Sequence, residues 1–169
     1  DGIFRVVGDG DDWDVRPFAQ DTILLAPDAI DTMDNTAYAL TTAGFVSITE
    51  SGVQKISGPL VGDDFRGLWK QFQSTTPPLP YTFAVQVSAD KYRNEVWINF
   101  DDTDDDQSAF VVTYIWNTET STFTTQSTEQ SIAVTYSPYL QSIVVGTPAL
   151  QLRKYAATTY MTGNFEFNP

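Results

Sequence analysis

Five aspartates crowd one short stretch of the sequence, and they are the side chains whose type and spacing come nearest to a chemical site. The stretch reads FDDTDDDQS, residues 100–108, with Thr103 among the acids. The acids are Asp101, Asp102, Asp104, Asp105 and Asp106. Three interpretations are open: a calcium or magnesium site, a pair of catalytic carboxylates, or a solvated turn whose aspartates hydrogen-bond to the local backbone.

The spacing does not match an EF-hand. In a loop that starts at Asp101, oxygen ligands stand at positions 1, 3 and 5. Position 6 is Asp106 where the sharp turn needs glycine, and position 12 is Val112 where the loop needs a bidentate glutamate. A looser cation site stays open, but the pattern favours the solvated turn.

Carboxylate catalysis is not favoured either. A glycosidase needs two acids roughly 5–9.5 Å apart, one of them with a pKa raised by burial, whereas neighbouring aspartates in a polar loop are ionised and hydrated. The chain has no cysteine and no histidine, which excludes thiol nucleophiles, serine–histidine pairs and the usual zinc ligand sets. We therefore predict no enzyme and no catalytic, cofactor-binding or metal-binding residues.

Two further features invite a binding role. The segment GDGDDWD, Gly8–Asp14, resembles a cation loop or a phosphate cradle. It has no lysine, and its acids repel phosphate, so we expect a flexible acidic linker between strands. The aromatic residues Trp13, Tyr92 and Tyr139 could stack on sugars, and glycan binding therefore stays open.

Composition and charge narrow the classes of function. The 169 residues are 41% hydrophobic and 14% aromatic, as in a globular domain with a core. Aspartate and glutamate outnumber lysine and arginine by 22 to 9, for a net charge of −13, which disfavours clamping of nucleic acid. No apolar run is long enough to span a membrane, and no signal-peptide pattern opens the sequence. Because the first residue is Asp1, we expect a processed chain or part of a longer protein.

The elements that carry these residues are mostly short strands. Alternating or apolar runs rich in Val, Ile, Thr, Phe and Tyr are separated by turn residues, which predicts an all-β chain. The runs are Thr22–Ala26, Ala37–Thr41, Phe45–Thr49, Val53–Ser57, Thr82–Ser88, Glu95–Phe100, Ala109–Trp116, Ser121–Thr125, Ser131–Ser137, Ser142–Gly146, Leu150–Tyr155 and Asn164–Phe167, with a remnant at Gly2–Val7.

One segment breaks the pattern. Asp63 is a plausible N-cap, and apolar residues from Phe65 to Phe72 recur at helical spacing. We expect a short helical insertion over about residues 61–72, ended by the proline-rich run at 77–80.

The strands repeat in groups of four. FAVQVS at Phe83–Ser88 matches IAVTYS at Ile132–Ser137, and a polar turn and an apolar strand follow each. Blade-like units are predicted at about 22–57, 82–125 and 131–167, within a single β domain covering 1–169. Four-stranded units of this period indicate a β-propeller, of which the three units would be part, and a β-sandwich is the alternative. In such blades the enlarged connections at 100–108 and 58–80 lie on one face, where we expect contact with a partner.

The sequence also resembles a known family. The stretches that carry the resemblance are NTAYALTTAGFVSITESGVQKIS, DDFRGLWKQF, RNEVWINFDDTDDDQSAFVVTYIWNTETSTFTT and IAVTYSPYLQSIVVGTP. They are similar to the propeller part of the tail nozzle proteins of short-tailed phages, also called tail tubular or packaged-DNA stabilization proteins. Arg93–Trp97, Asp102–Asp104, Tyr114–Asn117 and Phe123–Thr124 fit the family's blade pattern, and the similarity spans roughly 21–155.

The resemblance implies a structural virion component of the phage tail. It implies a homo-oligomeric ring that extends the portal channel, contacts other tail or portal-adaptor proteins, retains packaged DNA and passes it during ejection. An acidic lumen would repel the DNA and let it slide. The alternative from another class is a carbohydrate-binding or glycan-active β-propeller.

Overall fold

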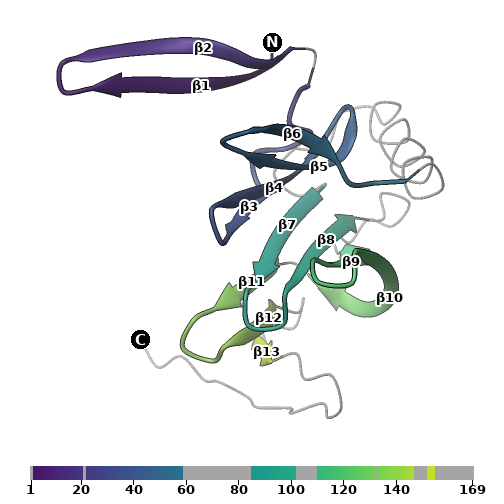
Figure 1. Ribbon diagram of the computed structural model, residues 1–169. Helices are drawn as coiled ribbons and strands as arrows, with labels where there is room; N and C mark the ends of the chain where they lie inside the picture. Colours follow the sequence, from purple (N-terminus) through teal and green to yellow (C-terminus); the bar gives the residue numbers. More distant parts are fainter. Residues whose placement is uncertain are drawn as a thin grey trace, which may run out of the picture.

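The structure is a computed structural model that describes residues 2–20, 22–58, 85–101, 110–131, 133–146 and 152–154. Every regular element in these ranges is a β-strand, which confirms the all-β prediction (Figure 1). The predicted helix at 61–72, most of the aspartate loop and the last predicted strand lie outside the described residues. In this part of the chain, no helix is long and apolar enough to cross a membrane.

The strands form four antiparallel sheets. The two-stranded sheet is a hairpin, and the other sheets have the strand orders β3-β4-β5-β6, β10-β9-β8-β7 and β11-β12-β13. The bounds are β1 (Gly2–Asp9), β2 (Asp12–Gln20), β3 (Ile30–Met33), β4 (Thr36–Thr41), β5 (Gly44–Thr49), β6 (Gly52–Lys55), β7 (Val85–Asp90), β8 (Glu95–Asp101), β9 (Phe110–Asn117), β10 (Thr122–Ser131), β11 (Ala133–Ser137), β12 (Ser142–Gly146) and β13 (Leu152–Lys154).

The structure corrects two expectations near the N-terminus. The segment Thr22–Ala26 is not a strand: its one bridge joins Leu24 to Thr41, and a turn with the Ala29 amide donating to the Ala26 carbonyl interrupts the pairing. The first strand of this sheet is Ile30–Met33 instead. The segment Gly8–Asp14 is not a linker, because it forms the end of β1, a tight turn and the start of β2.

Three turns share one construction. Asp90, Asn117 and Ser137 each begin a five-residue turn by accepting hydrogen bonds from backbone amides two or three residues ahead. The fifth residue of each turn has a positive φ: Asn94 (57°), Ser121 (54°) and Gln141 (47°). The same turn therefore closes the β7–β8, β9–β10 and β11–β12 hairpins, which is a structural repeat in addition to the repeat of strands.

We expect Gln141→Gly to raise the free energy of unfolding by about 0.5–1 kcal/mol, because glycine adopts a left-handed backbone without the steric cost of a side chain. Gln141→Val should lower it by about 1–2 kcal/mol, since a β-branched residue is the worst fit there. Urea unfolding measures both effects. Gln54→Gly, in the middle of β6, is the control and should be destabilising; a stabilising effect at both sites would contradict the turn argument.

The core lies between the sheets, and β7 and β8, the first two strands of the β7–β10 sheet, are buried on both faces. Val96, Ile98 and Phe100 of β8 pack against residues of the β3–β6 sheet, including Leu40 and Phe45. The intervening residue Trp97 points to the other face. There it packs with Ile115 of β9 and with Val134 and Ile143 of the β11–β13 sheet. Because successive side chains of a strand point to opposite faces of the sheet, β8 contributes to both cores.

Side chains and loops tie the first strands of the three larger sheets together. The Val87 amide of β7 donates to the Asp28 carbonyl (2.8 Å), and the Ala89 amide donates to Asp31 Oδ2 (2.8 Å). Strand β11 is joined to β7 in a similar way. The Val134 amide of β11 donates to Gln86 Oε1 (2.9 Å), and the Ser88 hydroxyl donates to the Val134 carbonyl (2.7 Å). The free edges of β7 and β11 are thus capped by polar groups of the preceding unit. In the described ranges the three sheets stack in a row and do not close into a ring (Figure 1).

Candidate functional site

An open groove of about 400 Å³ lies where the β3–β6 sheet meets the β9–β10 hairpin. Its walls combine two aromatic rings, hydroxyls, one amide and one ammonium group. The lining residues are Thr36, Tyr38, Ser47, Thr49, Gln54, Lys55, Ile56, Trp116, Thr118 and Ser121. Rings beside hydrogen-bonding groups suit a polar ligand with one apolar face, such as a sugar.

A row of four aromatic rings forms the floor of this junction. Tyr38 stacks on Phe45 with centroids 6.2 Å apart, and Phe123 meets Phe45 edge-on at 6.0 Å. Trp116 tilts over Phe123 at 4.7 Å. The row crosses from β4 and β5 to β10 and β9, so the two sheets hold the groove rings in place through rigid packing.

Tyr38 is half-buried, and burial raises the pKa of its hydroxyl above the ordinary value of 10.0. The negative charge of Asp34 raises this pKa further, whereas the hydrogen bond with Thr36 lowers it. The net direction is upward, so the folded state holds the phenolic proton more tightly than the unfolded chain does.

This shift predicts a dependence of stability on alkaline pH. The contribution of Tyr38 is fully present below pH 10 and is lost as the pH rises from the ordinary pKa through the raised folded pKa. Urea unfolding at a series of pH values from 9 to about 11.5 should give a steeper loss of stability for the parent chain than for Tyr38→Phe. Asp34→Asn should reduce the slope in part; equal slopes in all three chains would contradict the assignment.

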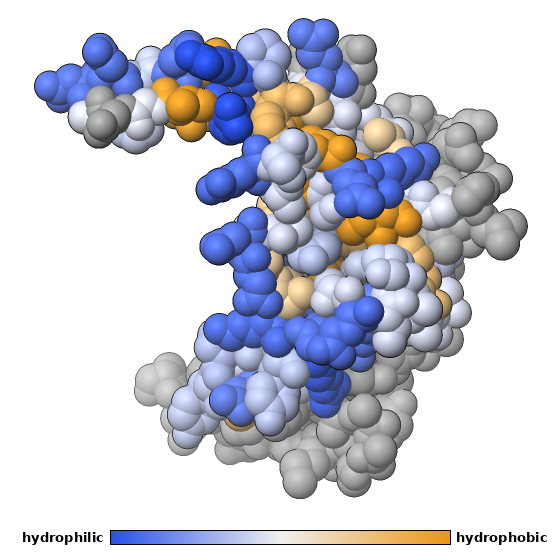
Figure 2. All heavy atoms as spheres, viewed as in Figure 1, coloured by the Kyte–Doolittle hydropathy of each residue, from blue (hydrophilic) through white to orange (hydrophobic). Residues whose placement is uncertain are grey.

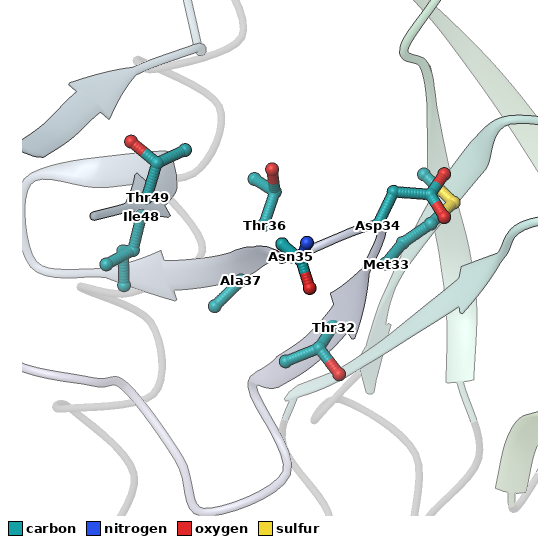
Figure 3. A pocket seen from close by; sticks show the side chains of 8 residues that line it. All are labelled: Thr32, Met33, Asp34, Asn35, Thr36, Ala37, Ile48 and Thr49. Atoms are coloured by element: carbon teal, nitrogen blue, oxygen red, sulfur yellow. The ribbon is translucent and has the colours of Figure 1, made fainter. Parts of the chain in front are cut away.

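A second hollow, of about 390 Å³, surrounds the β3–β4 turn. The turn consists of Asp34 and Asn35, both with positive φ (50° and 61°), as a two-residue turn between antiparallel strands requires. Figure 3 shows the short side chains of Thr32, Thr36 and Ala37 around it. Among the described residues of the lining, Asp34 alone carries an ionisable group, so they hold no second acid for a catalytic pair.

Those of the residues singled out from the sequence that the structure describes do not lie together in one site. Asp101 is the last residue of β8, and Asp102–Asp106 lie outside the described residues. Among the described residues no group of three or more metal-ligating side chains occurs. Trp13 stands on β2, whereas Tyr92 and Tyr139 stand on turns at the other end of the molecule (Figure 1). The three aromatics therefore do not form a single sugar platform.

Sequence reasoning missed the groove, because its lining comes from two sheets far apart in the chain. The available signal was the pair Tyr114 and Trp116, two residues apart on one predicted strand and thus on one face. Both residues belong to the core shared with the β3–β6 sheet. Which residues face them depends on how the sheets stack.

The β1–β2 hairpin is the most exposed part of the described chain. It projects from the body as an arm, and Figure 2 shows apolar residues on it among charged ones. Its links to the body include a hydrogen bond from Arg5 Nη1 to the Glu50 carbonyl at 3.3 Å. On the arm, Arg16 pairs with Asp14 (2.7 Å) and Arg5 lies over the Phe18 ring. Most of the surface of this arm is therefore exposed.

Neither a scan against models of known protein families nor a search of curated proteins finds a match for this chain.

Proposed function

We propose that the chain is the propeller-type part of a structural virion protein, a tail nozzle protein of a short-tailed phage. In this proposal several copies form a homo-oligomeric ring that extends the portal channel and contacts other tail or portal-adaptor proteins. The ring retains packaged DNA and passes it during ejection. The protein performs no reaction and needs no cofactor for this role.

The arrangement of the three larger sheets supports the propeller part of the proposal. Each sheet is built in chain order, and its first strand lies beside the first strand of its neighbour through the bonds of Val87, Ala89 and Val134. Blades placed around an axis have this property, because their first strands line the centre. Strand β8 also contributes side chains to a core on each face of the β7–β10 sheet, as expected of a blade that lies between two neighbouring blades.

The charge of the chain supports the channel role. A net charge of −13 gives a potential that repels phosphate, so DNA would slide through a lumen of such subunits and not adhere. Lysine and arginine are few, nine against 22 acids, so a duplex would meet far more negative than positive side chains.

Electron cryomicroscopy of the source particle tests this proposal directly. We expect density for this chain in a symmetric ring around the DNA channel of the tail. Its location in a peripheral fibre, in the capsid shell, or outside any particle would refute the nozzle role.

The groove favours one other function, glycan recognition. Tyr38 and Trp116 offer ring faces beside Lys55, whose ammonium suits an acidic sugar. A glycan array, run with and without calcium, distinguishes the two functions. Binding that Lys55→Ala and Trp116→Ala both remove would favour the glycan function, and absence of binding leaves the structural role as the better account.

A further inference from the structure

We propose that the β1–β2 arm docks head-to-tail on a second copy of this chain, at the tyrosine-bearing turns of the β7–β8 and β11–β12 hairpins. The inference deepens the proposed ring and rests on it for closed symmetry, but the pairwise contact stands on the arm and the turns themselves.

The arm has one apolar face, set by its strand register. Phe4 pairs with Pro17, Val6 with Val15, and Gly8 with Trp13. These residues alternate along both strands, so their side chains share a face, while the Arg5–Arg16 pair lies on the other. Gly8 is required here, because a Cβ at this position would stand 2.3 Å from the backbone carbonyl oxygen of Asp12, and 2.9 Å from Trp13 Cε3. The indole thus lies against the glycine and completes the apolar face.

Nothing within the described chain covers this face. The exposed fractions are 55% for Phe4, 59% for Val6, 66% for Trp13 and 60% for Val15. Together these side chains expose on the order of 400 Å², which is as large as the biggest apolar patch of a typical monomer. A two-stranded hairpin is also marginally stable in water by itself. Both facts call for a partner surface.

The receiving surface is repeated on two neighbouring sheets. Tyr92 and Tyr139 hold the same place, the third residue, in two turns of the shared construction, and they are 67% and 94% exposed. Their turns lie at the end of the body opposite the arm (Figure 1). An arm therefore cannot fold back onto the tyrosines of its own chain.

Charge complementarity selects a second copy as the partner. The tip of the arm carries the exposed acids Asp11 and Asp12, next to Trp13. The β7–β8 turn carries Lys91 and Arg93 on either side of Tyr92, in a chain with only nine lysines and arginines. In the proposed contact, the acids and the indole at the tip of one copy's arm face the bases and the phenol ring on the β7–β8 turn of the next copy. The aromatic patch of each partner lies at the centre of the proposed contact, and a specific interface buries roughly 1,000 Å² or more in total.

The two surfaces differ and lie at opposite ends, so the contact is heterologous. Repeated, it generates a ring where the rotation closes and a filament where it does not. An isologous contact of two arms would instead stop at a dimer.

Cysteine cross-linking tests the geometry, because the chain has no cysteine of its own. We expect Asp11→Cys mixed with Lys91→Cys to give a cross-linked pair with a short bismaleimide, whereas either variant alone gives much less. Gln54→Cys replaces Lys91→Cys as the control and should not link. Efficient linking of Asp11→Cys to itself, or none in the mixture, would overturn the head-to-tail contact.

Sedimentation velocity of the 169-residue chain over a range of concentrations tests the energetics. Trp13→Lys and Tyr92→Lys should each weaken self-association at least about tenfold, as at central interface aromatics. Val7→Lys, on the opposite face of the arm, should change it less than about twofold. Asp11→Lys and Lys91→Asp should each weaken association, and the double variant should recover it. A parent chain that is monomeric at high micromolar concentration overturns the inference.

The docking proposal and the nozzle proposal can fail independently of each other. Self-association through the arm with no ring in a phage tail would refute the nozzle role alone. A tail ring in which the arm contacts something other than the two turns would refute the docking alone.

Discussion

Phe45→Ala should lower the free energy of unfolding by about 3–5 kcal/mol, a large part of the 5–15 kcal/mol typical of a domain. Phe45 is fully buried, and its ring stands between Tyr38 and Phe123, at 6.2 and 6.0 Å. The truncation therefore removes core volume and also the link between the β3–β6 and β7–β10 sheets. Urea unfolding gives the change, and thermal unfolding should show a midpoint lower by roughly 10 °C or more.

Phe45→Leu is the matched control, since it keeps most of the volume and should cost less than half as much. Combined with Phe123→Ala, the effect of Phe45→Ala should be less than additive because the rings touch. Combined with Ile143→Val, in the core on the other side of the β7–β10 sheet, it should be additive. A loss below about 1.5 kcal/mol for Phe45→Ala would show that the sheets are not joined through this ring.

Replacing Gln86 and Ser88 together by alanine should cost about 2–4 kcal/mol. The two side chains hold the amide and the carbonyl of Val134, which is 2% exposed. Without them, both backbone groups lose their partners in a buried place, and each unsatisfied group costs roughly 1–3 kcal/mol. Urea unfolding measures the loss of stability. Amide hydrogen exchange should show that β11 and β12 lose protection before the other strands.

Gln54→Ala, at an exposed position of β6, is the control and should change stability by less than about 0.5 kcal/mol. Uniform loss of protection across all sheets, or no loss at β11, would contradict the role of Gln86 and Ser88 as caps of that strand.

The periodicity of the sequence was sufficient to predict most of the strands. In the units at 82–125 and 131–167, the alternation of Val, Ile and aromatic residues placed strands where β7 to β13 are described, with ends shifted by a few residues. The first unit was less tractable. TILLA has strand-like composition but Pro27 follows it, whereas IDTM looks polar and pairs because Asp34 and Asn35 make a tight turn. Attention to that two-residue turn would have found β3.

The arm was overlooked because charge hid its pattern. Four aspartates between Asp9 and Asp14 suggested a solvated linker, yet Trp13, Val15 and Pro17 alternate with Asp14 and Arg16 as in a strand. The groove and the capping contacts could not be read from the sequence at all. They depend on which sheet faces which, and tertiary packing decides that.

The free edges of β7 and β11 are each capped by polar groups of the preceding sheet, and this affects how the chain folds during synthesis. The amides of Val87 and Ala89 find their acceptors at Asp28 and Asp31, which leave the ribosome first, and Val134 finds its partners on β7. Each sheet therefore leaves the ribosome after the sheet that caps its first strand, which favours folding from the N-terminal end onward. The effect of a deletion should therefore depend on which end of the chain is removed. A chain that lacks β11–β13 keeps its largest core, whereas a chain that lacks β3–β6 loses it.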